Sequence, residues 1–140
     1  MSAIFIDTNV LAYAYDAREP DKRGIAQGLY TKSDFSVSAQ VLGELFVTLT
    51  RKLPGSMPPE MAGQIIDGLR TQTVVPLSEA LVAAAIDTSI RHQLSYWDAL
   101  IIEAAVAGGC TTLLTEDLAD GTVIRGVEIV NPFRELGEAG

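Results

Sequence analysis

Short apolar runs alternate with helix-length segments along the whole chain, and this alternation limits the fold more than any other feature. Residues 3–6 are continuously apolar and are followed at once by turn-forming residues, which is typical of a buried parallel strand. Further strands are predicted at 35–38, 73–75, 111–114 and 127–130. Helices are predicted to begin near residue 10 and to span 39–52, 60–70, 79–92 and 96–107, with a polar loop at 16–23. The pattern predicts an α/β sandwich with a largely parallel sheet.

The chain has 140 residues, about the length of one domain. Apolar residues make up 48% and charged residues 20%, which excludes a disordered chain. We expect one domain over residues 1–134 and a flexible tail at 135–140. No apolar run reaches the roughly 18 residues of a membrane span, and no basic leader precedes the first apolar residues, so we expect a cytoplasmic protein.

Histidine and cysteine are nearly absent, and this narrows the possible chemistry. One cysteine, Cys110, and one histidine, His92, exclude a multi-thiolate zinc site, a pair of catalytic histidines and a metal site of several imidazoles. Eighteen acids against ten bases give a net charge of −8, which argues against broad electrostatic binding of nucleic acid. Carboxylates are therefore the expected agents of any chemistry.

Two acids follow predicted strands. Asp7 comes directly after the first strand, and Asp117 follows the strand at 111–114 after two residues. Ligands of an open parallel sheet bind beyond the carboxyl ends of the strands, so both carboxylates are expected at that edge. Turn formation is an equally good explanation for Asp7 taken alone.

Two further acids lie on predicted helices. Asp98 falls in the first turn of a helix that is apolar nearly all round, where the helix dipole favours an acid. Burial of its charge costs several kcal/mol unless a cation lies nearby, for which Arg91 and a metal ion are candidates. Glu44 lies about 140° around its helix from the apolar stripe and by itself is typical of a solvated glutamate.

The joint pattern is more informative than any one of these acids. Carboxylates that converge without histidine or thiolate are ligands for a hard cation such as Mg²⁺ or Mn²⁺. Their mutual repulsion amounts to several kcal/mol, so the cluster is tolerable chiefly when a metal neutralises it. One or two such ions polarise a phosphodiester and activate water, so the pattern predicts metal-assisted hydrolysis of a phosphate ester.

Four segments resemble the PIN-domain ribonucleases, and within that family the VapC-like toxins of type II toxin–antitoxin (VapBC) pairs. They are FIDTNVLAYAYD (5–16), SAQVLGELFVTLTRK (38–52), SYWDALIIEAA (95–105) and LLTEDLADG (113–121). They occur in the family's order and approximate spacing, over essentially the whole chain. The resemblance implies a three-layer α/β/α fold and endonucleolytic cleavage of RNA by metal-activated water, which leaves 3′-hydroxyl and 5′-phosphate ends.

The same resemblance implies the site residues and the partners. The implied ligands of one or two Mg²⁺ or Mn²⁺ ions are Asp7, Glu44, Asp98 and Asp117. Thr8 and Asn9 would brace Asp7, and Thr115 would position the water or the phosphate. Whether Glu116, Asp117 or Asp120 faces the metal stays open. A homodimer and a small cognate antitoxin that covers the cleft are the expected assemblies.

An acidic protein must hold RNA through local bases. The nominated bases are Arg18, Lys22, Arg23, Arg51 and Arg91. The charge balance favours a particular folded RNA over indiscriminate binding of polyanions. Trp97 is expected to anchor the core or an interface.

Two other functions remain open at this stage. One is a catalytically silent PIN-like module that binds protein, and the other is a phosphatase that forms an aspartyl phosphate. The phosphatase pattern D-x-D-x-T is poorly matched, because Asn9 occupies its second acidic position.

Overall fold

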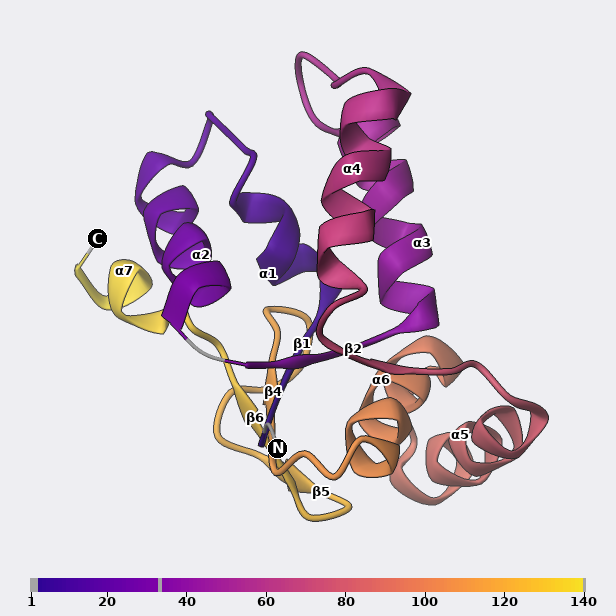
Figure 1. The fold of residues 1–140 in the computed structure, drawn as a ribbon. Helices are drawn as coiled ribbons and strands as arrows, with labels where there is room; N and C mark the ends of the chain where they lie inside the picture. Colours follow the sequence, from indigo (N-terminus) through magenta and orange to yellow (C-terminus); the bar gives the residue numbers. More distant parts are fainter. Residues whose placement is uncertain (1–2, 33, 140) are drawn as a thin grey trace.

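A six-stranded sheet forms the centre of the computed structural model, which describes residues 3–32 and 34–139 (Figure 1). The strand order is β3-β2-β1-β4-β6-β5, and the pairs are parallel except for the antiparallel β5–β6. The strands are β1 (Ile4–Ile6), β2 (Ser36–Ser38), β3 (Thr73–Val75), β4 (Thr112–Leu114), β5 (Val123–Ile124) and β6 (Val127–Val130). The largely parallel sheet is confirmed, and β5 is an antiparallel edge strand that the sequence did not predict.

Helices flank the sheet, with α5 and α6 on the side opposite α1 to α4 (Figure 1). Their bounds are α1 (Thr8–Tyr13), α2 (Pro20–Lys32), α3 (Ala39–Val47), α4 (Pro59–Leu69), α5 (Glu79–His92), α6 (Tyr96–Ala107) and α7 (Arg134–Ala139). The chain moves outward along the sheet from β1 to β3 and then returns to β4 through α5 and α6. Because crossovers between parallel strands are right-handed, this change of direction places α5 and α6 on the other face of the sheet. The predicted α/β/α architecture is confirmed. No helix in the described ranges is long and apolar enough to cross a bilayer.

Serine side chains cap the N-termini of three helices, α3, α5 and α6. The hydroxyl oxygens of Ser38, Ser78 and Ser95 each accept a hydrogen bond at 3.1 Å from the backbone N–H three residues later. Such caps satisfy an N–H group that has no partner within its helix, and a cap of this kind contributes about 1 kcal/mol. The starts of α5 and α6 therefore lie where the sequence predicted them.

Three segments differ from the predictions. The predicted polar loop at 16–23 is wrong beyond residue 19, because Pro20 begins α2 and Asp21 lies in its first turn, both favourable at a helix start. The predicted helix at 39–52 ends as α3 at Val47 and continues as a π-helical segment, Thr48–Lys52. No helix was predicted at 135–140, where residues 135–139 belong to α7 and Leu136 packs against the core; residue 140 lies outside the described residues, and the flexible tail stays a prediction.

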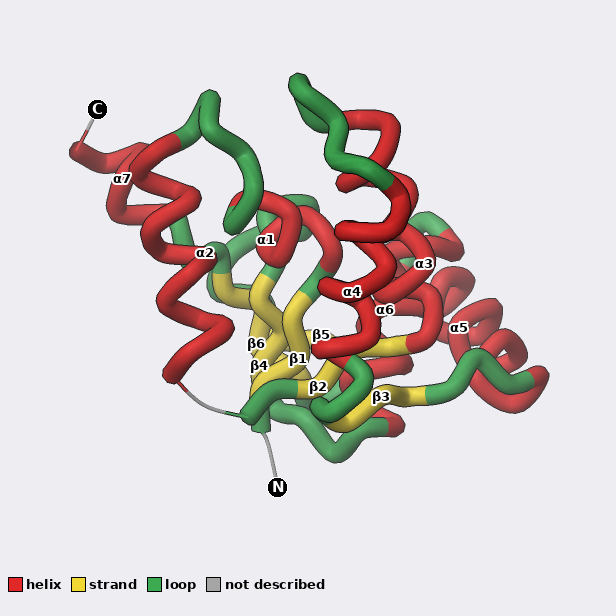
Figure 2. Tube along the Cα trace, turned by 45° about the horizontal axis from the view of Figure 1, so that its top comes forward, coloured by secondary structure: helices red, strands yellow, loops and turns green. Residues whose placement is uncertain are grey.

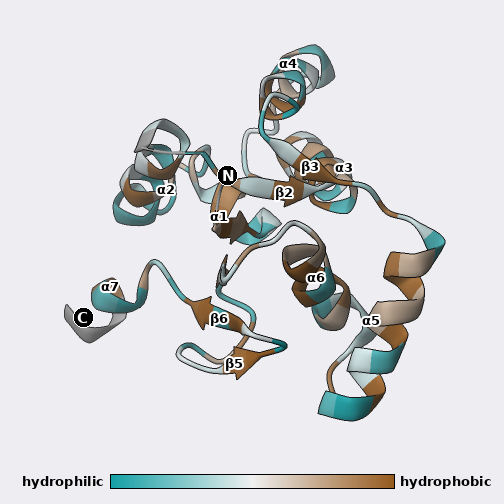
Figure 3. Ribbon diagram, turned by 60° about the horizontal axis from the view of Figure 1, so that its bottom comes forward, coloured by the Kyte–Doolittle hydropathy of each residue, from teal (hydrophilic) through white to brown (hydrophobic). Residues whose placement is uncertain are grey.

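The helix α6 is buried nearly all round, as predicted, and much of its ribbon has the brown colour of hydrophobic residues in Figure 3. Its deeply buried acid is Glu103, whose side chain is 3% exposed, rather than Asp98. Glu103 accepts hydrogen bonds from the Thr88 hydroxyl at 2.7 Å and from Arg125 Nε at 2.9 Å. Burial raises the pKa of Glu103, but these hydrogen bonds outweigh it, so the pKa lies below its usual value. The cation expected beside Asp98 thus lies beside another acid of the same helix.

Arg91 was the candidate counterion of Asp98, and this prediction is wrong. Its Nε lies 2.9 Å from a carboxylate oxygen of Asp87, one turn earlier on α5. Both side chains are mostly exposed, so the pair is a surface contact of small energetic value.

A two-residue turn joins β5 to β6, and both of its residues are left-handed. The φ angles are 56° at Arg125 and 77° at Gly126. A side chain in this conformation costs roughly 1–2 kcal/mol. We therefore expect Gly126→Ala to lower the free energy of unfolding by about 1 kcal/mol in urea titrations.

The matched control is Gly63→Ala in the middle of α4. A Cβ at Gly63 meets no heavy atom within 4 Å, so the change adds helix propensity without a clash. It should raise the free energy of unfolding by about 0.5–1 kcal/mol. Equal effects of the two substitutions would contradict the conformational assignment of the turn.

Candidate active site

The two central strands bring Asp7 and Thr115 together at the carboxyl edge of the sheet. Strands β1 and β4 are parallel neighbours with Ile6 opposite Leu114, so the residues that follow them face each other (Figure 2). The Asp7 backbone N–H donates to the Leu114 carbonyl oxygen at 3.0 Å. Asp7 is also the N-cap of α1, where its Oδ1 accepts from the Thr8 backbone N–H at 2.7 Å. Both ends of the Asp7 residue are thereby fixed.

Thr115 is the centre of a small hydrogen-bond network. Its hydroxyl is fully buried and donates to Asp7 Oδ2 at 2.9 Å. The Thr115 hydroxyl oxygen also accepts hydrogen bonds from the Asn9 side-chain amide at 3.3 Å and from the Asp117 backbone N–H at 3.1 Å. Asn9 in turn accepts from the Glu116 backbone N–H at 3.3 Å. The network holds α1 and the loop after β4 in one fixed arrangement around the Asp7 carboxylate.

The Asp7 carboxylate lies in an unfavourable electrostatic environment. The residue is 9% exposed, and burial raises its pKa to about 6, although the hydrogen bonds from Thr115 and Thr8 act in the opposite direction. The negative charges of Asp117 and Glu44 raise the pKa further. No lysine or arginine side chain in the described part of the chain lies within salt-bridge distance of Asp7. Asp7 is thus a buried acid without a counterion there.

The loop after β4 contains three acids, and two of them form ion pairs with basic side chains. Glu116 accepts from Lys22 Nζ at 2.7 Å, and Asp120 lies 3.4 Å from Arg134. Asp117 is exposed and has no ion pair among the described residues, and its charge acts on Asp7. Of the three alternatives, Asp117 is therefore the acid that is left available beside Asp7.

Glu44 and Asp98 approach the same edge from the two helical layers. Glu44 is exposed on α3, where its Oε1 accepts from the Gln40 amide at 2.7 Å. Asp98 is half-buried in the first turn of α6, and its carboxylate has no hydrogen bond or ion pair within the described ranges. Because α6 leads directly into β4, it runs antiparallel to that strand, and its N-terminus lies at the carboxyl edge of the sheet. Gln40, Glu44 and Trp97 line one hollow of about 300 Å³, so α3 adjoins the start of α6.

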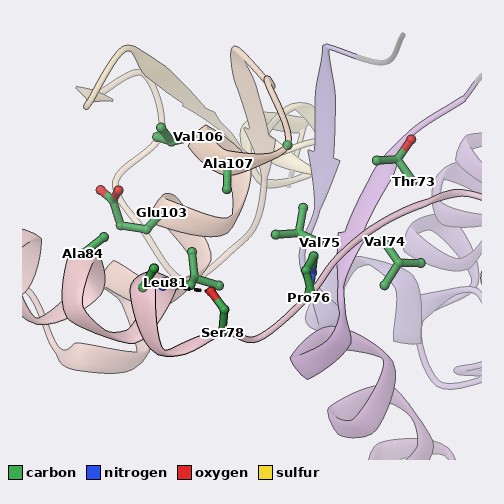
Figure 4. Close-up of a pocket in the computed structure, with 12 residues that line it drawn as sticks. Thr73, Val74, Val75, Pro76, Ser78, Leu81, Ala84, Glu103, Val106 and Ala107 are labelled. Atoms are coloured by element: carbon green, nitrogen blue, oxygen red, sulfur yellow. Dashed lines mark hydrogen bonds between the residues drawn. The ribbon is translucent and has the colours of Figure 1, made fainter.

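A larger hollow lies away from these acids. It measures about 480 Å³ and is bordered by β3, α5 and α6 (Figure 4). Its lining is mainly apolar and includes none of the predicted site residues. The predicted reactive groups lie instead at the acidic edge.

Comparison with known proteins identifies the family. A family model of the PIN domain matches residues 4–119. The chain belongs to the PIN-domain family. No curated protein matches its sequence.

Solved structures with a similar fold come from toxin–antitoxin systems. The VapC20 toxin of Mycobacterium tuberculosis, which cleaves the sarcin–ricin loop, has TM-score 0.60 and 22% identity over 81% of this chain and 89% of that one. A toxin–antitoxin complex from Klebsiella pneumoniae has TM-score 0.66 and 22% identity over 94% and 98% of the two chains. DNA-bound VapBC from Salmonella typhimurium has TM-score 0.64 and 17% identity over 94% and 99%. These likenesses confirm the PIN fold.

The acids of this PIN domain have the donor chemistry of a hard-cation site but are not arranged as a closed chelate. Among the residues that the structure describes, no three Asp, Glu, His or Cys side chains lie close enough to hold one metal ion. The charges of Asp117 and Glu44 both act on the Asp7 carboxylate. Uncompensated carboxylate oxygens without nitrogen or sulfur ligands suit Mg²⁺ or Mn²⁺, so the donor set fits such an ion. An ion bound by all four acids would have to draw them closer together.

The nominated RNA-binding bases are less available than the sequence suggested. Arg18 lies 2.9 Å from Asp16, and Lys22 is held by Glu116. Arg91 is paired on α5 as described above. Arg23 is half-buried and Arg51 is exposed, and neither has an ion pair in the described part of the PIN domain. Arg23 and Arg51 are thus the two of these five bases without an ion pair among the described residues.

The raised pKa of Asp7 predicts a pH-dependent stability. The folded state binds this proton more tightly than the unfolded chain, whose aspartate has the usual pKa of 3.8. Stability is therefore lost as pH rises from about 4 to about 6, by up to about 3 kcal/mol for a shift of this size. In EDTA, Asp7→Asn should unfold at higher urea concentration than the wild type at pH 7.5, and the difference should vanish near pH 4.

An exposed aspartate provides the control. The Asp67 side chain is 73% exposed in its pair with Arg70, so Asp67→Asn should change stability little and by the same amount at both pH values. A gain for Asp7→Asn that does not vary with pH would contradict the raised pKa.

Proposed function

We propose that this PIN domain is a Mg²⁺- or Mn²⁺-dependent endoribonuclease and the toxin of a toxin–antitoxin pair. The proposal is carried by the Asp7 carboxylate, which is buried, held by Thr115 and placed in the negative field of Asp117 and Glu44. A buried carboxylate close to other negative charges is characteristic of functional sites, and a divalent cation neutralises the repulsion between these charges. The fold shared with VapC20, a toxin that cleaves RNA at the sarcin–ricin loop, supports a structured RNA as the substrate.

The proposed ligands of one or two ions are Asp7, Glu44, Asp98 and Asp117. When bound, such ions polarise the phosphodiester and supply a nucleophile by lowering the pKa of water. Asp7 accepts one hydrogen bond on each carboxylate oxygen, and each oxygen therefore keeps a lone pair for an ion. Thr115 fixes the orientation of that carboxylate, and Asp117 is held close by its backbone N–H on Thr115. The hydrogen bonds of Thr115 thus orient the Asp7 carboxylate and the start of the following loop.

The arrangement around Asn9 supports hydrolysis of a phosphodiester over an aspartyl-phosphate mechanism. A phosphatase of that class requires a second acid two residues after its nucleophile. Asn9 occupies this position and uses both ends of its amide to connect Thr115 and Glu116. It braces the site and has no proton to donate as an acid.

The proposed assembly is a homodimer that is inhibited by a cognate antitoxin in the cytoplasm. The complexes from Klebsiella pneumoniae and Salmonella typhimurium support a protein partner of this kind. Because the exposed acids Glu44 and Asp117 border the site, we expect the antitoxin to present a basic residue there.

Cleavage of RNA tests the proposed activity directly. Purified wild-type protein with Mn²⁺ or Mg²⁺ should produce new 5′-phosphate ends in total RNA, mapped by sequencing of the ends. Asp7→Ala and Asp98→Ala should each lower the rate by at least about 100-fold, because loss of a metal ligand costs at least as much as loss of its outer support. Asp67→Ala, on an exposed surface of α4, should cleave at the wild-type rate.

The outcomes separate the alternatives. Retained cleavage in both active-site variants would assign the activity to another site or a contaminant. Wild-type protein that makes no new ends with either metal, yet binds a protein partner, would identify a silent binding module.

Metal binding can also be measured without activity. At a concentration of 100 times its Kd, an ion that binds only the folded protein adds about 2.7 kcal/mol of stability. Mn²⁺ should therefore raise the Tm of the wild type at pH 7.5, less so at pH 5, where Asp7 holds a proton. Asp7→Asn should abolish most of this increase. An equal increase in the variant would place the ion elsewhere.

A further inference from the structure

Trp97 is the single tryptophan of the chain, and it lies at the surface of the proposed active site. Its side chain is 63% exposed on the first turn of α6, one residue before Asp98. We expected Trp97 to anchor the core or an interface; this exposure rules out the core, and the interface stays a prediction. The ring of Tyr96 packs edge-on against the indole at a centroid distance of 4.9 Å, which supports the indole from one side. A large aromatic ring is thus held in solvent beside a proposed catalytic acid.

The indole borders a hollow that Glu44, one of the proposed acids, also lines. Trp97, Gln40 and Glu44 line this space of about 300 Å³, at the lower end of the range for small-ligand pockets. Glu44 is one of the two acids whose charge raises the pKa of Asp7. The Gln40 amide donates one N–H to Glu44, so within the described residues its other N–H and its carbonyl oxygen remain available. A group that occupies the hollow therefore meets an aromatic face, an amide and the edge of the acidic site.

The charge of the protein makes such a surface useful for binding RNA. The net charge is −8, and the pairs of Lys22 with Glu116 and Arg18 with Asp16 neutralise the bases nearest Asp7 in sequence. These pairs leave fewer bases near Asp7 for contacts with phosphate. Stacking of a base on an aromatic ring requires no positive charge and is tolerant of sequence.

We propose that Trp97 stacks on a nucleobase of the RNA beside the cleaved phosphodiester and so positions the substrate over the acids. This inference rests on the proposed nuclease function. An apolar protein side chain is less suited to the hollow, because covering the indole with apolar groups would also bury the Glu44 carboxylate. A base stacks on the ring, meets the Gln40 amide with its polar edge, and leaves Glu44 open to solvent and ions.

Fluorescence of the single tryptophan reports the contact directly. The probe is a ten-nucleotide adenylate RNA, titrated with Mn²⁺ present into Asp7→Asn protein, in which cleavage is blocked. Stacking should quench Trp97 emission, with the same midpoint as the anisotropy of a labelled copy of the probe. Inorganic phosphate at equal charge concentration should leave the emission unchanged, since it has no base to stack.

Substitutions separate stacking from simple burial. In the same background, Trp97→Phe should bind the probe within a few-fold of the parent, whereas Trp97→Leu should bind roughly 5- to 100-fold more weakly. The loss should be the same at 50 and 200 mM salt, because no phosphate contact is removed. In the active protein, Trp97→Leu should raise KM more than it lowers kcat. The control is Ile90→Ala, a 71% exposed apolar residue on α5, which should change none of these values.

Each outcome decides the inference. Wild-type cleavage that Trp97→Leu leaves unaffected, or probe binding without a change in emission, overturns the stacking role while the nuclease function stands. Weaker binding that arises only because Trp97→Leu changes the oligomeric state in size-exclusion chromatography also overturns it, and assigns Trp97 to a protein interface. Quenching in a protein that never cleaves RNA supports stacking and rejects the nuclease function. Absence of any RNA binding overturns both.

Discussion

The hydrogen bond from the Thr115 hydroxyl to Asp7 Oδ2, at 2.9 Å, joins the two central strands where they end. It depends on the parallel register of β1 and β4, which places the residues after Ile6 and Leu114 opposite each other. The same hydroxyl oxygen accepts the Asp117 backbone N–H, so the following loop is fixed relative to the buried carboxylate. The other acids of the proposed site are arranged around this contact, and its geometry is set by the sheet rather than by flexible side chains.

Two of the buried acids, Glu103 and Asp7, lie in opposite electrostatic environments. Glu103 is neutralised by Arg125 and Thr88, and its pKa falls below the usual value even though burial raises it. The pKa of Asp7 instead rises to about 6, because burial is joined by the charges of Asp117 and Glu44, and no lysine or arginine among the described residues pairs with it. A carboxylate left in this state destabilises the metal-free fold at neutral pH. Such a cost is typical of functional sites, where stability is given up for an arrangement that a ligand completes.

Helix α6 shows how far the sequence could be interpreted without the structure. Its apolar circumference predicted burial, and Ser95 predicted its start; both are confirmed. The need for a cation beside a buried acid was also correct in principle. It was assigned to Asp98, whereas the structure pairs Glu103 with Arg125, from a hairpin turn more than twenty residues later. Periodicity cannot reveal this pairing, because both acids lie on a helix that is apolar on every side.

The sequence by itself determined the order of most strands and helices, the capped helix starts and the acids that follow the strands, because these depend on local backbone preferences and on hydrophobic periodicity. Only the tertiary structure decided which acids lie close enough for their charges to interact. The strand order places Asp7 near Asp117. The neighbouring Glu116 instead forms an ion pair with Lys22 of α2. The tertiary structure also decided that Trp97 faces solvent, since the exposure of a residue on an apolar helix depends on which neighbours cover it. Interactions between residues distant in the chain carry no signature in local sequence, and the proposed site consists almost entirely of such interactions.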